Sequence, residues 1–274
     1  MQSKASKAVG LRHRPVAVVF TDSRPAGAKQ FKEGKWGCVM FMLAAAAKGE
    51  TAVFDRRTYG CQGGGTGLGF GNQYEHFPGG QACFCYFLST GNDQWETGLK
   101  ISEKVKPFLR AEAYDDFMHG ERYIQTPALV KNFIENLPIT DVAFKYVVFK
   151  PLDDVKPDDE PPQIVVFLGD MDQVSALTIL TNYARTTSDN VIFPYAAGCM
   201  STVLYPLNET KSENPKAVLG LNDISARLYL KRLLKTDVMS FAVPWPLFNE
   251  IEDNVPGSFL GRHTWKGLRG RKES

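Results

Sequence analysis

Three cysteines are the residues whose type and position first suggest chemistry. Cys38 lies at the start of an apolar, alanine-rich stretch, Cys61 opens a glycine-rich segment, and Cys199 takes a comparable place in the second half of the chain. At a predicted helix start, unpaired amides and the helix dipole favour a thiolate over a thiol. Three thiolates brought together by folding would be ligands for an iron–sulfur cluster or a zinc ion. We therefore predict a metal or redox centre at Cys38, Cys61 and Cys199, with an iron–sulfur cluster as the candidate cofactor.

A purely structural role for these cysteines stays open as the alternative. The separations between them match no standard ferredoxin or zinc motif, and cysteine is among the residue types most often buried. Cys83 and Cys85 are left outside the predicted site, because residues two apart share a side only on a strand. The five cysteines form an odd number in a chain without an evident export signal, which disfavours a complete disulfide framework.

A glycine-rich segment, GCQGGGTGLGFG, runs from Gly60 to Gly71. Glycine has a high entropic cost in helices and strands, so the segment is predicted to be a loop. Its amides would approach an anion closely, and two arginines after a predicted strand would pair with that anion. The predicted binding residues are Gly63, Gly64, Gly65, Arg56 and Arg57. The segment fits neither dinucleotide-binding nor P-loop spacing, and a tight structural connection is the alternative.

Two strand-helix-strand patterns are expected to position these residues. The first comprises a strand at 15–22, a helix at 36–48 and a strand at 51–55; the second comprises a strand at 164–168, a helix at 172–185 and a strand at 191–193. Such units build parallel sheets, so the predicted fold class is α/β, or α+β. Further helices are expected at 77–88, 126–137 and 225–235, and further strands at 143–152 and 238–243.

The two patterns suggest an internal duplication. An acidic, proline-rich link at 153–162 separates a first lobe, 1–152, from a second lobe, 163–261, and a basic tail follows at 262–274. We predict two similar halves packed as pseudo-symmetric lobes in one compact unit, with chance similarity of short apolar strings as the competing explanation. The tail is predicted to be a solvated, partly disordered terminus, and a role in nucleic-acid binding is not expected.

Composition excludes several classes of protein. The 274 residues carry 32 basic and 30 acidic side chains, and a net charge of +2 creates no strong field toward nucleic acid or anionic lipid. The longest apolar stretch, 38–47, is about half of the ~20 residues that span a bilayer, so no membrane association is expected. The polar, basic N-terminus predicts a cytoplasmic protein. Oligomer formation is compatible with the sequence but no heptad marks an interface.

A family resemblance follows from the order of several strings. PVAVVF is followed by WGCVMFMLAAAAKGETAVFDRRTYGCQGG, then by YVVFKPL, PPQIVVFLGD, GCMS and MSFAVPWPLFNEI. In this order the chain resembles the prokaryotic family of uncharacterised ArCR proteins, domain of unknown function 169. The resemblance implies redox or cofactor biology in bacteria and archaea, with no assigned activity. The family pattern falls here on Trp36, Cys38, Cys61, Gly63 and Gly64; TGLGFG and the basic tail are not placed in it.

The sequence thus predicts a cytoplasmic protein that binds a redox centre or a small anionic molecule in a cleft rich in cysteine and glycine. The alternative is a non-catalytic small-molecule binding protein whose cysteines are structural. No hydrolase elbow, zinc-protease helix, kinase signature or EF-hand loop is present, and the sequence does not decide whether the protein is an enzyme.

Overall fold

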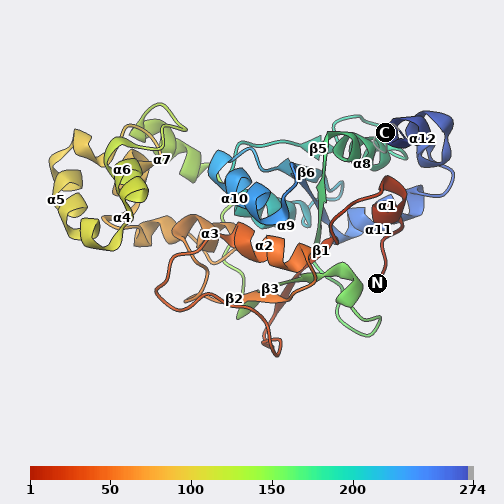
Figure 1. Ribbon diagram of the computed structural model, residues 1–274, viewed down its shortest axis with the longest axis horizontal. Coiled ribbons are helices and arrows are strands. Elements are labelled where there is room, and N and C mark those ends of the chain that lie inside the picture. Colours follow the sequence, from red (N-terminus) through yellow and green to blue (C-terminus); the bar gives the residue numbers. More distant parts are fainter. Residues whose placement is uncertain (271–274) are drawn as a thin grey trace. The chain divides into compact units, whose positions relative to one another are not determined.

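The computed structural model describes residues 1–270, which form two compact units (Figure 1). The first unit combines residues 1–69 with the chain from residue 142 onward, and the second consists of Phe70–Asp141. The second unit is an insertion into the first, and the sequence analysis did not delimit it. The predicted lobes at 1–152 and 163–261 were based on internal similarity and stay a prediction.

A seven-stranded mixed sheet organises the first unit. Its strands are β1 (Val16–Thr21), β2 (Ala52–Phe54), β3 (Tyr146–Pro151), β4 (Ile164–Gly169), β5 (Val191–Ile192), β6 (Ala217–Gly220) and β7 (Met239–Pro244). They lie in the order β2-β3-β1-β4-β7-β6-β5 across the sheet. Together with the helices described below, the sheet confirms the predicted α/β class.

Strand pairing differs from the prediction. β1 and β2 were expected as parallel strands of one unit, but β3 lies between them and pairs with both in antiparallel fashion. β1 also pairs antiparallel with β4, with Val16 opposite Val166. Only β5 and β6 form a parallel pair among the strands described. The prediction of β1 and β2 as parallel neighbours is wrong, because β3, which is distant from both in sequence, lies between them in the sheet. The pseudo-symmetric relation between the halves is not confirmed.

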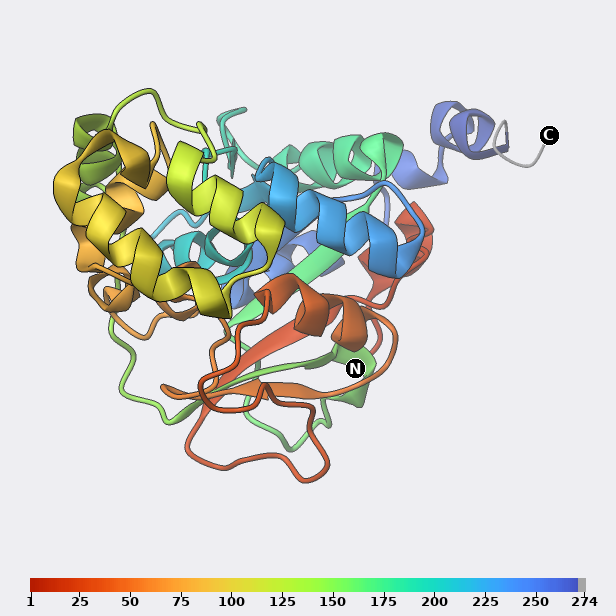
Figure 2. The ribbon, with the colours of Figure 1, turned by 60° about the vertical axis from the view of Figure 1, so that its left-hand side comes forward.

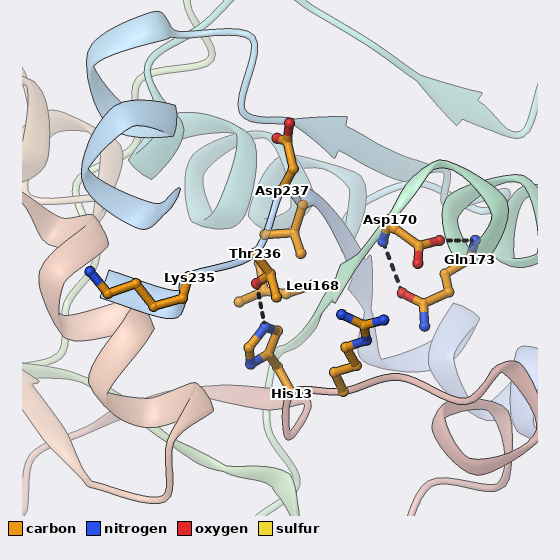
Figure 3. A pocket seen from close by; sticks show the side chains of 9 residues that line it. His13, Leu168, Asp170, Gln173, Lys235, Thr236 and Asp237 are labelled. Carbon is orange, nitrogen blue, oxygen red and sulfur yellow. Dashed lines mark hydrogen bonds between the residues drawn. The ribbon is translucent and has the colours of Figure 1, made fainter. Parts of the chain in front are cut away.

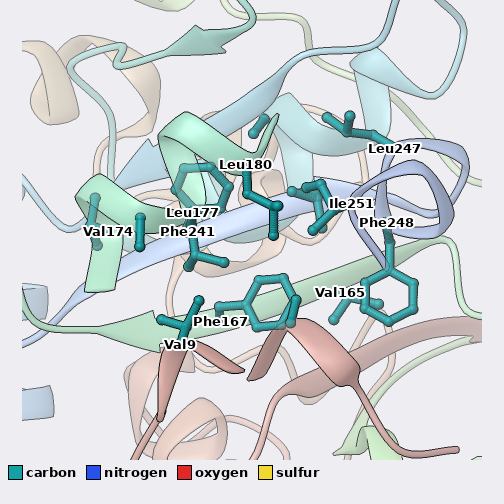
Figure 4. Close-up of a cluster of buried hydrophobic side chains, with 14 of the residues drawn as sticks. Val9, Val165, Phe167, Val174, Leu177, Leu180, Phe241, Leu247, Phe248 and Ile251 are labelled. Atoms are coloured by element: carbon teal, nitrogen blue, oxygen red, sulfur yellow. The ribbon is translucent and has the colours of Figure 1, made fainter. Parts of the chain in front are cut away.

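One face of the sheet carries the main hydrophobic core of the first unit. This layer consists of α1 (Lys4–Val9), α8 (Met171–Asn182) and α11 (Trp245–Asn254). Val165 and Phe167 alternate along β4, and Phe241 and Val243 along β7, so that their buried side chains point into this layer (Figure 4). Phe248 of α11 stacks on Phe167, with ring centroids 6.1 Å apart. The alternation follows from the two-residue period of a strand.

The opposite face carries the helices that position the candidate site. They are α2 (Val39–Ala47) and α10 (Ile224–Leu234), with α3 (Gln62–Gly67) and α9 (Tyr205–Glu209) following in the same unit. α10 lies beside α2 in both views (Figures 1 and 2). A Cβ built on Gly198 would lie 2.9 Å from Cβ of Ala226 and 3.0 Å from Sδ of Met40. Because glycine leaves this space free, the segment before Cys199 packs closely on both helices.

The second unit is helical. Its helices are α4 (Gly80–Phe87), α5 (Glu96–Val105), α6 (Ala111–His119) and α7 (Pro127–Glu135). Tyr74 stacks on Phe84 with centroids 4.1 Å apart, and further aromatic rings pack around this pair. α7 begins as predicted, because Oγ1 of Thr126 accepts the amide of Leu129 at 3.3 Å and Pro127 takes the first helical position.

The tail predicted to fray forms a helix in the part that the structure describes. α12 (His263–Gly270) buries Trp265, which is 6% exposed and whose indole donates to the carbonyl of Ala8 at 3.2 Å. Arg269 donates to the carbonyl of Gly10 at 3.0 Å. Residues 263–270 are helical, so the predicted disorder is wrong for them, because the buried Trp265 holds the helix; all of them except Trp265 and Arg269 are exposed, as a solvated terminus requires. Arg271 and Lys272 of the basic tail lie outside the described residues.

Candidate thiol site

Cys38 lies at the N-terminus of α2. The apolar run that follows it is a helix whose residues are mostly buried, and Cys38 is its N-cap, with an extended backbone at φ −90° and ψ 131°. Burial is the main effect on its thiol and, with the charge of Cys61, raises the pKa to about 12, although the amide of Met40 acts in the opposite direction. The expected stabilisation of a thiolate by the helix N-terminus is therefore wrong here, because desolvation outweighs it.

Cys61 is the N-cap of α3, and its sulfur accepts the amide of Gly64 at 3.3 Å. The glycine-rich segment predicted to be a loop is thus helical from Gln62 to Gly67. Close packing explains the glycines: a Cβ on Gly64 would lie 2.8 Å from the carbonyl oxygen of Tyr59 and 3.0 Å from Cγ2 of Val39. A side chain there would keep α3 from approaching α2, so packing outweighs the low helix propensity of glycine.

Cys199 lies in the first turn of another helical segment, directly before a π-helical turn at Met200–Leu204. It is buried, with 7% of its surface exposed, and its thiol donates to the carbonyl oxygen of Gly63 at 3.1 Å. A Cβ on Gly67 would lie 2.6 Å from its sulfur. Burial, followed by the charges of Cys61 and Cys38, raises the pKa of this thiol well above its ordinary value. Such π turns are frequent at functional sites.

The three predicted cysteines therefore lie around α3. The charge of Cys61 acts on the thiols of both Cys38 and Cys199, and that of Cys38 acts on Cys199. The backbones that lead into Cys38 and Cys61 are also in contact, since a Cβ on Gly60 would collide with the carbonyl of Gly37. Cys38 and Cys61 are partly exposed, whereas Cys199 is buried, and all five cysteines of the chain are free thiols.

The chain also matches the profile of a known protein family. The profile of the family described as Uncharacterised ArCR, domain of unknown function 169, matches residues 5–254. The chain belongs to this family. The match confirms the resemblance found in the sequence, and in this family member it spans all three cysteines and α3. No curated protein and no solved structure matches the chain. None of the helices in residues 1–270 has the length and apolar character needed to cross a bilayer.

Asp223 is a site residue that sequence analysis missed in this member of family 169. It is the N-cap of α10, where Oδ1 accepts the amides of Ser225 at 3.0 Å and Ala226 at 3.2 Å. Its charge contributes to the raised pKa of Cys38 and of Cys199. The signal was present in the sequence, because an aspartate two residues before a predicted helix at 225 is a typical cap.

The fit of an iron–sulfur cluster or a zinc ion depends on how these side chains are arranged. Residues 1–270 contain no group of three or more histidine, cysteine, aspartate or glutamate side chains arranged to hold a metal ion. The thiol of Cys199 is instead engaged with the backbone of α3 at Gly63 and Gly67. Metal binding by the three cysteines stays a prediction.

The residues predicted to bind an anion have other partners in the structure. Nη2 of Arg56 donates to the carbonyl of Val142 at 2.7 Å, and Nη1 of Arg57, whose side chain is 76% exposed, lies 3.7 Å from Glu33. Gly63, Gly64 and Gly65 belong to α3. The amide of Gly64 binds the sulfur of Cys61, and that of Gly65 the carbonyl of Cys61 at 2.8 Å. Anion binding by these five residues stays a prediction, and the amides of Gly64 and Gly65 already have acceptors.

An aromatic cluster adjoins the thiols. Trp36, two residues before Cys38, lies edge-on to Phe41 and Tyr229, with centroids 6.1 Å away in both cases. Trp36 is 63% exposed, so its ring forms part of the surface beside the partly exposed Cys38.

Proposed function

We propose that Cys38, Cys61 and Cys199 form a thiol redox centre in which Cys38 and Cys61 alternate between a dithiol and a disulfide. The observation that supports it is the convergence of the three thiols, from segments far apart in sequence, on one short helix. Cys38 and Cys61 follow backbones in contact and are accessible from solvent. Disulfide formation requires both short backbone separation and access.

The proposed reaction is thiol–disulfide exchange with a small disulfide. The thiolate of Cys61, whose sulfur receives the amide of Gly64, attacks one sulfur of the substrate and releases the first substrate thiolate. The sulfur of Cys38 then attacks the Cys61 sulfur of the mixed disulfide, and the proton of Cys38 passes to the second substrate thiolate as it leaves. One substrate disulfide is reduced to two thiols while two protein thiols become one disulfide. In the cytoplasm predicted from the sequence, reducing thiols would restore the dithiol.

An aromatic disulfide reagent whose released thiolate absorbs visible light tests this order of events. The wild-type protein should release two thiolates in its fast phase and retain no adduct. Cys38→Ser should release one and retain a mixed disulfide on Cys61, while Cys61→Ser should lose the fast phase. Cys83→Ser is the control, because this buried thiol lies in α4 and should leave the fast phase unchanged. A fast phase of one thiolate in the wild-type protein, with a stable adduct, would contradict the proposal.

The predicted iron–sulfur centre is a separate hypothesis for the same three cysteines. Purification under anaerobic conditions followed by iron and sulfide analysis tests it. Iron and sulfide in amounts stoichiometric with protein, lost in Cys61→Ser, would replace dithiol exchange with cluster binding. The purely structural alternative predicts that Cys61→Ser keeps all binding and loses little stability.

A further inference from the structure

A hollow at the end of β4 has no part in the thiol site. Its volume is about 250 Å³, smaller than the pockets that hold drug-sized ligands. Three stretches of the first unit meet there: Arg12 and His13 before β1, the turn from β4 into α8, and the connection from α10 to β7 (Figure 3). The end of a strand where the chain turns into a helix is a common place for ligands in α/β proteins.

The connection from α10 to β7 starts beside this hollow with a residue of positive φ. Lys235 adopts φ 58°, a left-handed backbone that residues with a side chain rarely take. Thr236 follows it and is 2.8 Å from Nε2 of His13, a contact drawn in Figure 3. Lys235 is the C-cap of α10, a position at which a left-handed backbone is common, so the contact of Thr236 with His13 is what ties this connection to the hollow.

The hollow is lined by two cations, Arg12 and Lys235, and by two carboxylates, Asp170 and Asp237, each of which has another partner. Asp170 caps α8 by accepting the amide of Gln173 at 3.1 Å. Asp237 pairs with Arg227 and with Lys231, the latter at 3.2 Å. The side chain of Arg12 has no hydrogen-bond or ion-pair partner among residues 1–270, although it lines the hollow.

Burial and two nearby cations act on the imidazole of His13. Burial lowers the pKa of His13, and the charges of Arg12 and Lys48 lower it further. Arg12 is on the same segment, Lys48 follows α2, and the only carboxylates lining the hollow among the described residues are those of Asp170 and Asp237. An anion bound beside Arg12 would oppose these effects and favour protonation of His13.

We propose that this hollow binds the phosphate group of a small molecule, with Arg12 as the charged donor and His13 and Thr236 beside it. A guanidinium forms two parallel hydrogen bonds to phosphate, and the imidazole becomes a second charged donor once it takes up a proton. The N-terminus of α8 is not needed, because Asp170 and Gln173 already cap it. The proposal is independent of the thiol redox centre.

Titration of the histidine ring signals by nuclear magnetic resonance tests the site in the full-length protein. The probes are inorganic phosphate and glycerol phosphate, each compared with chloride at equal ionic strength. Bound phosphate should raise the pKa of His13, because it neutralises the field of Arg12 and Lys48, while the ring signals of His263 should not shift. Arg12→Gln should weaken phosphate binding about tenfold or more.

Arg14→Gln is the matched control. Arg14 is two residues from Arg12 and lies outside the hollow, where it pairs with Asp153 at 3.7 Å. Both variants replace an arginine by glutamine, so each removes one positive charge. Phosphate affinity should be nearly unchanged in this variant. The proposal is overturned if phosphate leaves the pKa of His13 where chloride leaves it, or if Arg12→Gln and Arg14→Gln weaken binding alike.

Discussion

Replacing Gly67 by alanine is the sharpest perturbation of the contact between α3 and Cys199. The new Cβ would lie 2.6 Å from the sulfur of Cys199, 2.9 Å from its Cβ and 3.0 Å from its carbonyl carbon. Two of these three atoms are rigidly attached to a buried helical backbone, so the clash cannot be relieved by rotating a side chain. Overpacking of this kind costs about 1–3 kcal/mol, and alanine recovers about 1 kcal/mol of helix propensity. We expect a net loss of about 1 kcal/mol, with about 2 kcal/mol as the upper limit.

Gly267→Ala provides the matched control. Gly267 is also helical, in α12, but a Cβ there has no atom within 4 Å. It should therefore be neutral or stabilise by up to about 1 kcal/mol. Urea unfolding followed by circular dichroism gives both midpoints, and adding Cys199→Ala to Gly67→Ala should recover part of the loss through a favourable coupling energy. Equal midpoints for the two alanine variants, or a coupling energy of zero, would refute the packing argument for α3.

Three further predictions concern pH, capping and the C-terminal helix. The pKa of the Cys38 thiol is near 9.0 in the unfolded chain and about 12 in the folded protein. The free energy of unfolding should therefore be constant below about pH 9 and fall between pH 9 and pH 12, by at most about 1.4 kcal/mol per pH unit. The urea midpoints at pH 8 and pH 10.5 should differ less in Cys38→Ala than in the wild-type protein. Asp170→Ala removes the capping box with Gln173 and should cost about 1 kcal/mol in the same assay. Trp265→Ala should release α12, seen as faster amide exchange confined to residues 263–270.

Elements whose signals are local were predictable from the sequence. β1 and β4 are apolar runs rich in β-branched residues, and both appear within a residue or two of the predicted ranges. α7 was predictable because Thr126 and Pro127 specify its first turn through a hydroxyl cap and a fixed φ. The family could also be recognised, since its motifs lie in these well-defined segments.

Features that depend on tertiary contacts were not predictable. α3 was missed because its glycines are selected by the close approach of Cys199 and Val39, which overrides intrinsic propensity. The insertion of β3 between β1 and β2 joins strands about a hundred residues apart, and no local pattern marks such pairing. α11 was not predicted, although its Pro246 lies in the first helical turn, where proline is well tolerated.

The candidate site was predictable in part. The approach of Cys38, Cys61 and Cys199 was predicted from an internal duplication that is not confirmed, and it depends on the close packing of α3 on the segments that carry Cys38 and Cys199. The protonation state of Cys38 was not predictable, because it depends on how completely the surrounding helices desolvate the thiol. No sequence motif marks the hollow beside His13, because its walls come from three separated stretches of the chain.

The proposed pairing of Cys38 with Cys61 is tested most directly by peptide mapping of the full-length protein equilibrated in glutathione redox buffers. After the thiols are blocked with an alkylating reagent, a peptide joining Cys38 to Cys61 should increase as the buffer becomes more oxidising and disappear on reduction, in wild-type protein and in Cys83→Ser alike. If Cys38 and Cys61 are instead recovered as separately alkylated or separately glutathionylated peptides at every buffer potential, the account of a dithiol centre is contradicted.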